Sequence, residues 1–440
     1  MTEIDKKIQK TIPSSKVQRV SRFVKVGAKV STNYIKHYAK TVLDNDYSGK
    51  EELHKENATD VYEALSELKG SALKVAQMMS MDKNMLPQAY IEKFQMSQYS
   101  APPLSLPLVN KTFIKSFGKA PYELFDTFTK EAVNAASIGQ VHLAVKDGKK
   151  YAVKVQYPGV AESVSSDLKL VKPIAVRMMG LNEQDVNHYM KEVEVMLLSE
   201  TDYELELQRS QKITEACKHI KNIYFPNYYK EYSSQKILTM DWLEGKHLNE
   251  FLETNPSQEI RNKVGQALWD FYDFQVHQLK EVHADPHPGN FIISEDGLLG
   301  IIDFGCVKEI PSDFYRNYFD LMIPENMNNE EKRKSVFASM RFIYDDDSES
   351  DKQYLDQLFK SMISILARPF HHDTFDFGEA AYFEEIQALA ENQENQNILR
   401  KSKKPRGIRD GLYLNRTYFG LYSILHQLEA EVKTDSIFFK

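Results

Sequence analysis

Apolar and polar residues alternate in two stretches on either side of Asp147-Gly148. The alternation covers residues 141–145 before this pair and residues 151–155 after it. A period of two is typical of half-buried strands, and Asp-Gly is typical of the tight turn that joins two such strands. The pattern therefore predicts a β-hairpin, and the apolar stretch 236–240 predicts one further strand.

A second, shorter hairpin is predicted around residue 296. The segments Asn-Phe-Ile-Ile at 290–293 and Leu-Gly-Ile-Ile at 299–302 flank the turn sequence Glu-Asp-Gly at 295–297. The remaining pattern from about residue 258 onward indicates helices, and residues 190–219 predict a single helix upstream.

These elements divide the chain into four regions and predict an α+β fold. Asn57 or Thr59 is the candidate N-cap of the second region. The prolines at 102, 103 and 107 predict an extended connection near its end. The regions are a basic N-terminal segment (1–55), a helical region (56–125), a region with the first hairpin (126–245) and a largely helical region with the second hairpin (246–440).

Composition narrows the class of protein. The chain has 440 residues and only two cysteines, so a disulfide framework is excluded and a reducing, cytoplasmic setting is expected. No apolar run reaches the roughly 18–20 residues that span a bilayer, and no secretory signal is recognisable. The formal net charge of −7 argues against nucleic-acid binding.

Residues 1–40 depart from this overall charge. They contain ten basic and two acidic residues and carry a formal charge of +8. A helix is expected near 16–31, with basic residues on one side and mostly apolar residues on the other. Two interpretations remain open: peripheral contact with an anionic membrane surface, or packing on the acidic remainder of the chain.

Residues 283–305 hold the strongest chemical signal. Asp285 is followed five positions later by Asn290, and after the second hairpin residues 303–305 read Asp-Phe-Gly. This order is typical of kinase-type phosphoryl transfer. Asp285 would accept a hydrogen bond from an attacking hydroxyl or water, while Asn290 and Asp303 are candidate magnesium ligands. A second Asp-Phe-Gly at 376–378 has no such element before it and is interpreted as chance.

Lys154 stands in the second strand of the first hairpin, on the side that faces the interior. A lysine in that position needs an anionic partner. The predicted helix downstream supplies four carboxylates, and Glu206 is the expected partner within ion-pair distance. The segment 134–140, which reads Asn-Ala-Ala-Ser-Ile-Gly-Gln, stands where a glycine-rich phosphate loop is expected, and by itself it would be a plain turn.

In combination, these motifs resemble the UbiB atypical kinases, also called the AarF or ADCK family. The resemblance runs from about residue 12 to the C-terminus, with Ala76 and Asn134 departing from the family pattern. It rests on Lys74-Val75-Ala76-Gln77, Ala135-Ala136-Ser137-Ile138-Gly139-Gln140, Val153-Lys154, Glu200-x-Asp202, His283-Ala284-Asp285-Pro286-His287-Pro288-Gly289-Asn290 and Asp303-Phe304-Gly305.

The resemblance implies a protein-kinase-like bilobal fold, with an N-lobe at 126–245 and a C-lobe at 246–440. It implies that the extension at 56–125 covers the active site and disfavours peptide substrates. The expected cofactors are ATP and Mg²⁺, and the expected partner is a quinone precursor or another lipid. The catalytic residues would be Asp285, Lys154, Glu206, Lys74 and Gln77, the metal ligands Asn290 and Asp303, and the nucleotide-binding residues Ala135, Ala136, Ser137, Lys154, Glu200, Asp202, Met240, Asp241 and Trp242.

Three functional classes stay open at this stage. The first is a kinase or ATPase that acts on a non-peptide partner in isoprenoid-quinone biosynthesis, which the motifs favour. The second is a small-molecule phosphotransferase of the aminoglycoside or choline kinase type, which needs neither Lys74 and Gln77 nor the motif at 200–202. The third is a non-catalytic scaffold that binds ATP.

Overall fold

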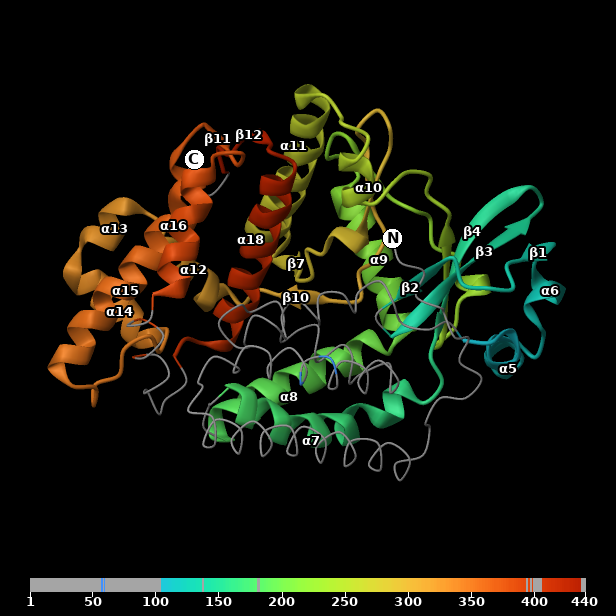
Figure 1. Ribbon diagram of the computed structural model, residues 1–440, viewed down its shortest axis with the longest axis horizontal. Coiled ribbons are helices and arrows are strands. Elements are labelled where there is room, and N and C mark those ends of the chain that lie inside the picture. Colours follow the sequence, from blue (N-terminus) through green and yellow to red (C-terminus); the bar gives the residue numbers. More distant parts are fainter. Residues whose placement is uncertain are drawn as a thin grey trace, which may run out of the picture. The chain divides into compact units, whose positions relative to one another are not determined.

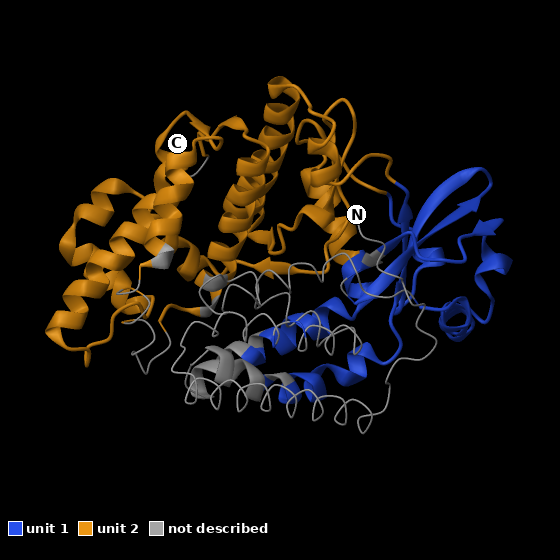
Figure 2. Cartoon of the chain, viewed as in Figure 1, with its two compact units in different colours: residues 1–207, 227–242 blue, residues 208–226, 243–440 orange. Residues whose placement is uncertain are grey.

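A computed structural model of the chain describes residues 104–436 except 137, 180–182, 393–394, 396–397 and 399–405, together with Asn57 and Thr59 (Figure 1). The chain forms two compact units. Unit 1 comprises residues 1–207 and 227–242, and unit 2 comprises residues 208–226 and 243–440 (Figure 2). The stretch 208–226 thus groups with unit 2 rather than with the residues that flank it in the sequence.

Unit 1 is built on an antiparallel sheet whose strands differ in length. Its strand order is β1-β3-β4-β6, and β2 pairs with β3. The turn between β3 and β4 has Asp147 at φ 49° and Gly148 at φ 75°, which is the left-handed backbone that a two-residue hairpin needs. The first predicted hairpin is therefore confirmed. The strands are β1 (Thr127–Phe128), β2 (Asn134–Ala136), β3 (Gly139–Lys146), β4 (Lys149–Gln156) and β6 (Ile237–Asp241).

Two short helices precede this sheet. They are α5 (Leu106–Phe117) and α6 (Pro121–Leu124). Phe113 of α5 is fully buried and packs edge-on against Phe128 of β1, which joins the helix to the sheet. Pro107 was expected in an extended connection, but it lies in the first turn of α5, where the missing N–H is not needed for a helical hydrogen bond. The N-cap prediction for Asn57 or Thr59 is also wrong, since both residues have helical backbone.

Three longer helices follow β4: α7 (Val160–Met179), α8 (Glu183–Glu200) and α9 (Tyr203–Cys217). The sequence predicted one helix over 190–219, and the structure divides it in two. At the break, the Asp202 side chain accepts a hydrogen bond from the backbone N–H of Leu205 at 3.1 Å. Asp202 therefore caps a new helix, a signal that apolar periodicity alone does not reveal.

Unit 2 is mainly helical, and α18 lies beside α11 (Figure 1). Within the described residues, no helix combines the length and apolar character needed to cross a bilayer. The helices are α10 (Leu248–Leu252), α11 (Gln258–Phe274), α12 (Ser312–Asp320), α13 (Pro324–Asn328), α14 (Glu330–Ser339), α15 (Glu349–Ala367), α16 (Ala380–Glu391) and α18 (Arg409–Gln427).

Small sheets connect these helices. β8 (Phe291–Ile293) and β9 (Leu299–Ile301) form the second predicted hairpin, and β5 (Ile223–Tyr224) joins it in parallel. The expectation that this hairpin interrupts an otherwise helical region is incomplete. Two further antiparallel pairs are present, namely β7 (Glu281–His283) with β10 (Val307–Glu309) and β11 (Thr374–Asp376) with β12 (Glu431–Lys433).

A buried ion pair joins β4 to α9 in unit 1. Lys154 Nζ lies 2.8 Å from Glu206 Oε1 and 3.1 Å from Oε2, and the two side chains are 6% and 1% exposed. The pairing predicted from the sequence is therefore present. The ring of Tyr203, the first residue of α9, lies 5.0 Å from the same ammonium group and adds a cation–π contact.

A buried histidine lies elsewhere in the same sheet. His142 Nδ1 lies 2.9 Å from the carbonyl oxygen of Thr129, which can only accept, so Nδ1 carries the ring proton. Nε2 is then the acceptor for the Gln140 side-chain amide at 2.8 Å, and Gln140 Oε1 accepts from the N–H of Leu104. Burial lowers the pKa of His142 from its ordinary 6.5 to about 4.

We expect unit 1 to lose stability as His142 is forced to protonate. Because the pKa of His142 is lower in the folded chain than in the unfolded chain, its contribution is complete above about pH 6.5 and is lost as the pH falls to about 4. The loss should approach about 3 kcal/mol in the free energy of unfolding. Since Trp242 is in unit 1 and Trp269 in unit 2, denaturant unfolding in a Trp269→Phe background reports on unit 1. His142→Gln should reduce the slope between these pH values; an unchanged slope would contradict the assignment.

Removing one member of the Lys154–Glu206 pair should destabilise the chain strongly. Glu206→Gln leaves a buried ammonium without its carboxylate, and we expect a loss of about 3–5 kcal/mol in the free energy of unfolding. Replacing both residues, by Lys154→Met with Glu206→Leu, should recover most of that loss. Glu215→Gln is the matched control, because the Glu215–Lys218 pair is largely exposed. Equal effects of Glu206→Gln and Glu215→Gln would show that the buried pair is not required for stability.

Candidate active site

In unit 2, the loop that follows β7 is held in place through His283, the last residue of that strand. His283 is fully buried, and its Nδ1 lies 2.9 Å from the hydroxyl of Tyr272. The backbone N–H of His283 donates to the side chain of Gln275 at 3.0 Å. Tyr272 lies near the end of α11, and Gln275 is the first residue of the π-helical turn Gln275–Leu279 that follows. The loop is therefore tied to the helix that precedes it.

Asp285 is contacted on both sides of its carboxylate. Arg416 Nη2 donates to Oδ1 at 2.7 Å, and the pair is 20% and 13% exposed. Asn290 Nδ2 donates to the backbone carbonyl of Asp285 at 2.8 Å and lies 3.4 Å from Oδ2. The sequence assigned Asp285 and Asn290 to one chemical site without predicting this contact, and it did not identify Arg416.

A signal for Arg416 exists in α18. One turn further along the same helix stands Gly420, where a Cβ atom would lie 2.4 Å from a side-chain carbon of Pro286. A glycine inside a helix lowers its stability and indicates a close approach by another segment. Arg416 stands one helical turn before this glycine, so the two residues mark the face of α18 that meets the loop.

The β8–β9 hairpin brings Asn290 and Asp303 together. The register pairs Phe291 with Ile301, and the N–H of Ile302 donates to the carbonyl of Asn290 at 3.1 Å. Asp303 accepts from the N–H of Gly305 at 2.8 Å, which orients its carboxylate. Since the Asn290 nitrogen is directed at Asp285, its amide oxygen is the atom suited to a metal. One carboxylate and one amide oxygen are ligands that Mg²⁺ accepts, so these residues fit that ion.

Two neighbouring residues have structural roles. His287 Nδ1 accepts from the N–H of Gly289 at 3.0 Å, so this histidine braces the loop. Cys306, directly after the Asp-Phe-Gly triplet, is buried and its carbonyl accepts from Ala284 at 2.9 Å.

The second Asp-Phe-Gly triplet offers a comparison. Asp376 accepts from the N–H of Gly378 at 2.8 Å, the same local turn that Asp303 makes, and Phe377 is fully buried like Phe304. Asp376 is exposed at the end of β11, however, where its neighbour is the edge strand β12. The Asp-Phe-Gly triplet alone thus produces the turn, but not the neighbouring aspartate and asparagine that accompany Asp303.

In unit 1, the segment 134–140 is not the plain turn that the sequence suggested. Asn134, Ala135 and Ala136 form β2, which pairs with Val141, Gln140 and Gly139. A Cβ at Gly139 would lie 2.5 Å from the carbonyl oxygen of Val155 and 2.8 Å from the Tyr203 hydroxyl. Glycine therefore lets β2 and β3 lie close to β4, the strand that carries Lys154. Ser137 lies outside the described residues.

The other residues expected to bind nucleotide lie near the ends of helices and strands in unit 1. Glu200, at the end of α8, is 5% exposed, and Asp202 caps α9. Met240 is buried in β6, and the carboxylate of Asp241 accepts hydrogen bonds from Asn227 and Tyr229 and pairs with Lys149.

The backbone of this strand end is also engaged. The N–H of Asp241 donates to the carbonyl of Asn227 at 2.9 Å, and that of Trp242 donates to Lys150 at 3.2 Å. Lys74 and Gln77 lie outside the described residues. In the part of the chain that the structure describes, no three His, Cys, Asp or Glu side chains gather as a metal site.

The sequence of this chain is similar to those of known proteins. A sequence model described as the ABC1 atypical kinase-like domain matches residues 96–336. The chain is 27% identical to the probable serine/threonine-protein kinase abkA of Dictyostelium discoideum, over 97% of this chain and 79% of that protein. It is 24% identical to the mitochondrial atypical kinase COQ8 of Saccharomyces cerevisiae, over 97% of this chain and 85% of that protein. Against a chloroplastic aarF domain-containing protein kinase of Arabidopsis thaliana it is 30% identical but spans only 40% of that protein.

A solved structure supports the same fold. The Mycobacterium tuberculosis protein Rv3197, in its complex with erythromycin, aligns with a TM-score of 0.59 and 26% identity, covering 87% of this chain and 95% of that one. The mixed helix-and-strand architecture is thus kinase-like, as the sequence predicted. The matched domain, which covers more than half of the chain, establishes that this chain belongs to the ABC1 atypical kinase-like family, also known as the UbiB, AarF or ADCK family.

Proposed function

We propose that the chain is an ATP-binding atypical kinase or ATPase that acts on a small or lipid-like partner and supports isoprenoid-quinone biosynthesis. One observation carries the proposal. Asn290 holds Asp285 through its backbone and side chain, and the β8–β9 hairpin sets Asp303 beside Asn290. A candidate proton acceptor and two hard oxygen ligands in such an arrangement are what phosphoryl transfer requires.

Asp285 would orient the attacking hydroxyl or water by accepting its hydrogen bond. Arg416 already donates to Oδ1, which holds the carboxylate beside a cation. An oxygen of a carboxylate accepts more than one hydrogen bond, so this contact leaves room for the acceptor. Little covalent assistance is needed, because the transition state of phosphoryl transfer is loose and catalysis depends mainly on positioning.

Asn290 and Asp303 would hold magnesium. The bound ion would supply positive charge for the β- and γ-phosphate oxygens. The two residues contribute to this by their fixed orientation, since each has a side-chain atom engaged by its own loop.

Lys154 would bind the phosphates, with Glu206 maintaining its charge and direction inside unit 1. We assign nucleotide contacts to the remaining residues of the expected set as well. They are Ala135, Ala136, Ser137, Glu200, Asp202, Met240, Asp241 and Trp242. The backbone N–H groups of Asp241 and Trp242 already donate to carbonyl oxygens in unit 1. This segment would therefore offer the nucleotide its carbonyl oxygens and the indole of Trp242. Lys74 and Gln77 would act from the extension at 56–125.

The family supports the proposed class of acceptor. Two relatives that match nearly the whole of this chain, from zebrafish (Danio rerio) and yeast, are named mitochondrial atypical kinases. A quinone precursor or lipid is the partner that this family context supports. A scaffold that only binds ATP is the competing proposal, and Asp285→Asn separates the two. Loss of ATP turnover with retained nucleotide binding supports an enzyme, whereas unchanged turnover removes Asp285 from the mechanism.

Asp303→Asn should abolish magnesium-dependent nucleotide binding. The substitution removes the only charged ligand of the proposed metal pair, and we expect at least about a hundred-fold weaker binding in the presence of magnesium. Titration calorimetry with ATP, with magnesium or with a chelator, measures the effect.

Asp376→Asn is the matched control, because Asp376 makes the same local turn in an exposed position. It should bind as the wild type does. Equal wild-type affinity with and without magnesium would refute the metal site.

Residues 1–40 are proposed to contact an anionic membrane surface, where each basic residue contributes on the order of 1 kcal/mol. The full chain should float with vesicles that contain phosphatidylserine, and the fraction bound should fall as salt is raised. Deletion of residues 1–40 should abolish flotation, while neutral vesicles are the control. Flotation that survives the deletion would assign the contact to another surface.

A further inference from the structure

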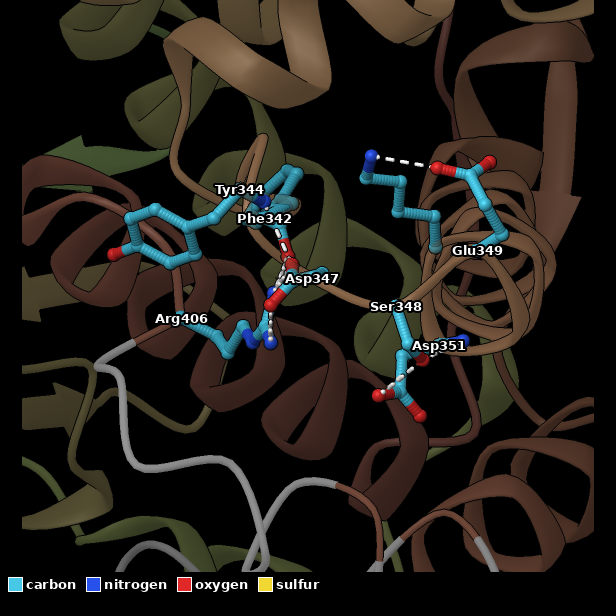
Figure 3. Close-up of polar contacts among 8 residues, drawn as sticks. Phe342, Tyr344, Asp347, Ser348, Glu349, Asp351 and Arg406 are labelled. Carbon is cyan, nitrogen blue, oxygen red and sulfur yellow. Dashed lines mark hydrogen bonds and ion pairs between the residues drawn. The ribbon is translucent and has the colours of Figure 1, made fainter.

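The loop between α14 and α15 is tied to the residue that precedes α18. The Arg406 guanidinium makes a two-pronged pair with Asp347, with Nη1–Oδ2 at 2.5 Å and Nη2–Oδ1 at 2.8 Å (Figure 3). Nη1 also donates to the carbonyl of Phe342 at 3.0 Å, and the guanidinium lies 5.3 Å from the ring of Tyr344. The two charged side chains are only 10% and 6% exposed.

The backbone adds to this contact. Gly407, at φ 87°, donates its N–H to the carbonyl of Arg341 at 2.9 Å. Arg341 itself has φ 59°, a left-handed conformation that non-glycine residues adopt only when their surroundings hold them. The chain just before α18 is therefore fixed by both its side chain and its main chain.

The loop is itself anchored on both sides. Asp347 Oδ2 accepts from the N–H of Tyr344 at 2.7 Å, which closes the loop on itself. The next residue, Ser348, caps α15 by accepting from Asp351 (Figure 3). On the other side, the Phe342 ring stacks on Phe359 of α15 at 4.5 Å. Arg406 thus attaches to a rigid part of unit 2.

Polar contacts lie on the half of α18 that precedes Arg416. Asp410 lies 3.5 Å from Lys308 of β10, and Asn415 accepts from the Tyr318 hydroxyl at 2.5 Å. Most of the deeply buried side chains that the structure describes in this helix lie beyond Arg416. Among the described residues at this end, Arg406 and Asp347 form the ion pair with the least exposed side chains.

We propose that Asp347 and Arg406 are positioning residues that fix the start of α18 and thereby hold Arg416 against Asp285. The importance of the contact for catalysis rests on the proposed function, but its effect on the loop does not. Arg406 lies three positions before α18, which begins at Arg409, and the chain is continuous helix from Arg409 to Arg416. A shift of the segment at Arg406 and Gly407 therefore moves the start of this helix and displaces Arg416 from Asp285. The Asp347 side chain controls that start, although it touches neither the loop nor a substrate.

Hydrogen exchange of the full chain, followed by mass spectrometry, tests the link. Asp347→Asn should accelerate exchange in a peptide covering residues 283–290 by about ten-fold to a hundred-fold, the loss expected when a charge-assisted contact is weakened. Protected amides exist there, because His287 donates to the Asp285 carbonyl and Asn290 donates to the His287 carbonyl. Arg406→Lys, which keeps the charge and loses the two-pronged geometry, should give a smaller increase. Asp345→Asn is the control, since Asp345 is an exposed neighbour in the same loop.

Faster exchange at the start of α18 with an unchanged 283–290 peptide in both variants would overturn the proposal. Turnover gives a second readout: Asp347→Asn should lower kcat for ATP several-fold and leave its KM within about two-fold, because the nucleotide residues lie elsewhere. If Asp285→Asn leaves turnover unchanged, the proposed function fails, and the exchange result still decides the positioning role.

Discussion

The Asp285 carboxylate depends on side chains that come from two directions in the sequence. Asn290 reaches it from within its own loop, and Arg416 reaches it from a helix 131 positions away. A partly buried carboxylate costs free energy unless cations and donors replace its water. The loop therefore keeps its geometry only while α18 stays in place, and the packing of Pro286 against Gly420 serves the same end. Much of unit 2 can be understood as support for that one helix.

Unit 1 meets the same constraint with the opposite charge. Lys154 is buried in a strand, and the sheet alone offers it no anion, so α9 must supply Glu206. Asp202 caps α9 and lets it start as a helix separate from α8. A single straight helix that continued α8 would keep the direction of α8. Gly139 contributes from the other side by allowing close approach to Val155 and Tyr203. The acidic motif thus has a structural part, in Asp202, besides the nucleotide role proposed for it.

What the sequence predicted well is local. Both hairpins carry turn residues that need left-handed backbone, and the Lys154–Glu206 pair follows from a buried lysine and a nearby run of carboxylates. What it missed depends on partners far along the chain. The break between α8 and α9 is set by a capping side chain, and β7 pairs with β10, which lies beyond the second hairpin in the sequence. Arg416 belongs to no recognised motif; apart from the glycine one turn further along α18, its role comes from the place where this helix packs.

The two Asp-Phe-Gly triplets separate local from long-range information. Asp303 and Asp376 both accept from the glycine N–H at 2.8 Å, and both phenylalanines are fully buried. Three residues are therefore enough to specify the turn and the anchor. They do not specify chemistry, since Asp376 ends an exposed edge pairing while Asp303 follows a hairpin that delivers Asn290. A site needs long-range contacts in addition to such a turn. In this chain the hairpin sets Asn290 next to Asp303, and α18 contacts the neighbouring loop through Arg416 and Asp285, so a helix outside the matched domain belongs to the proposed site.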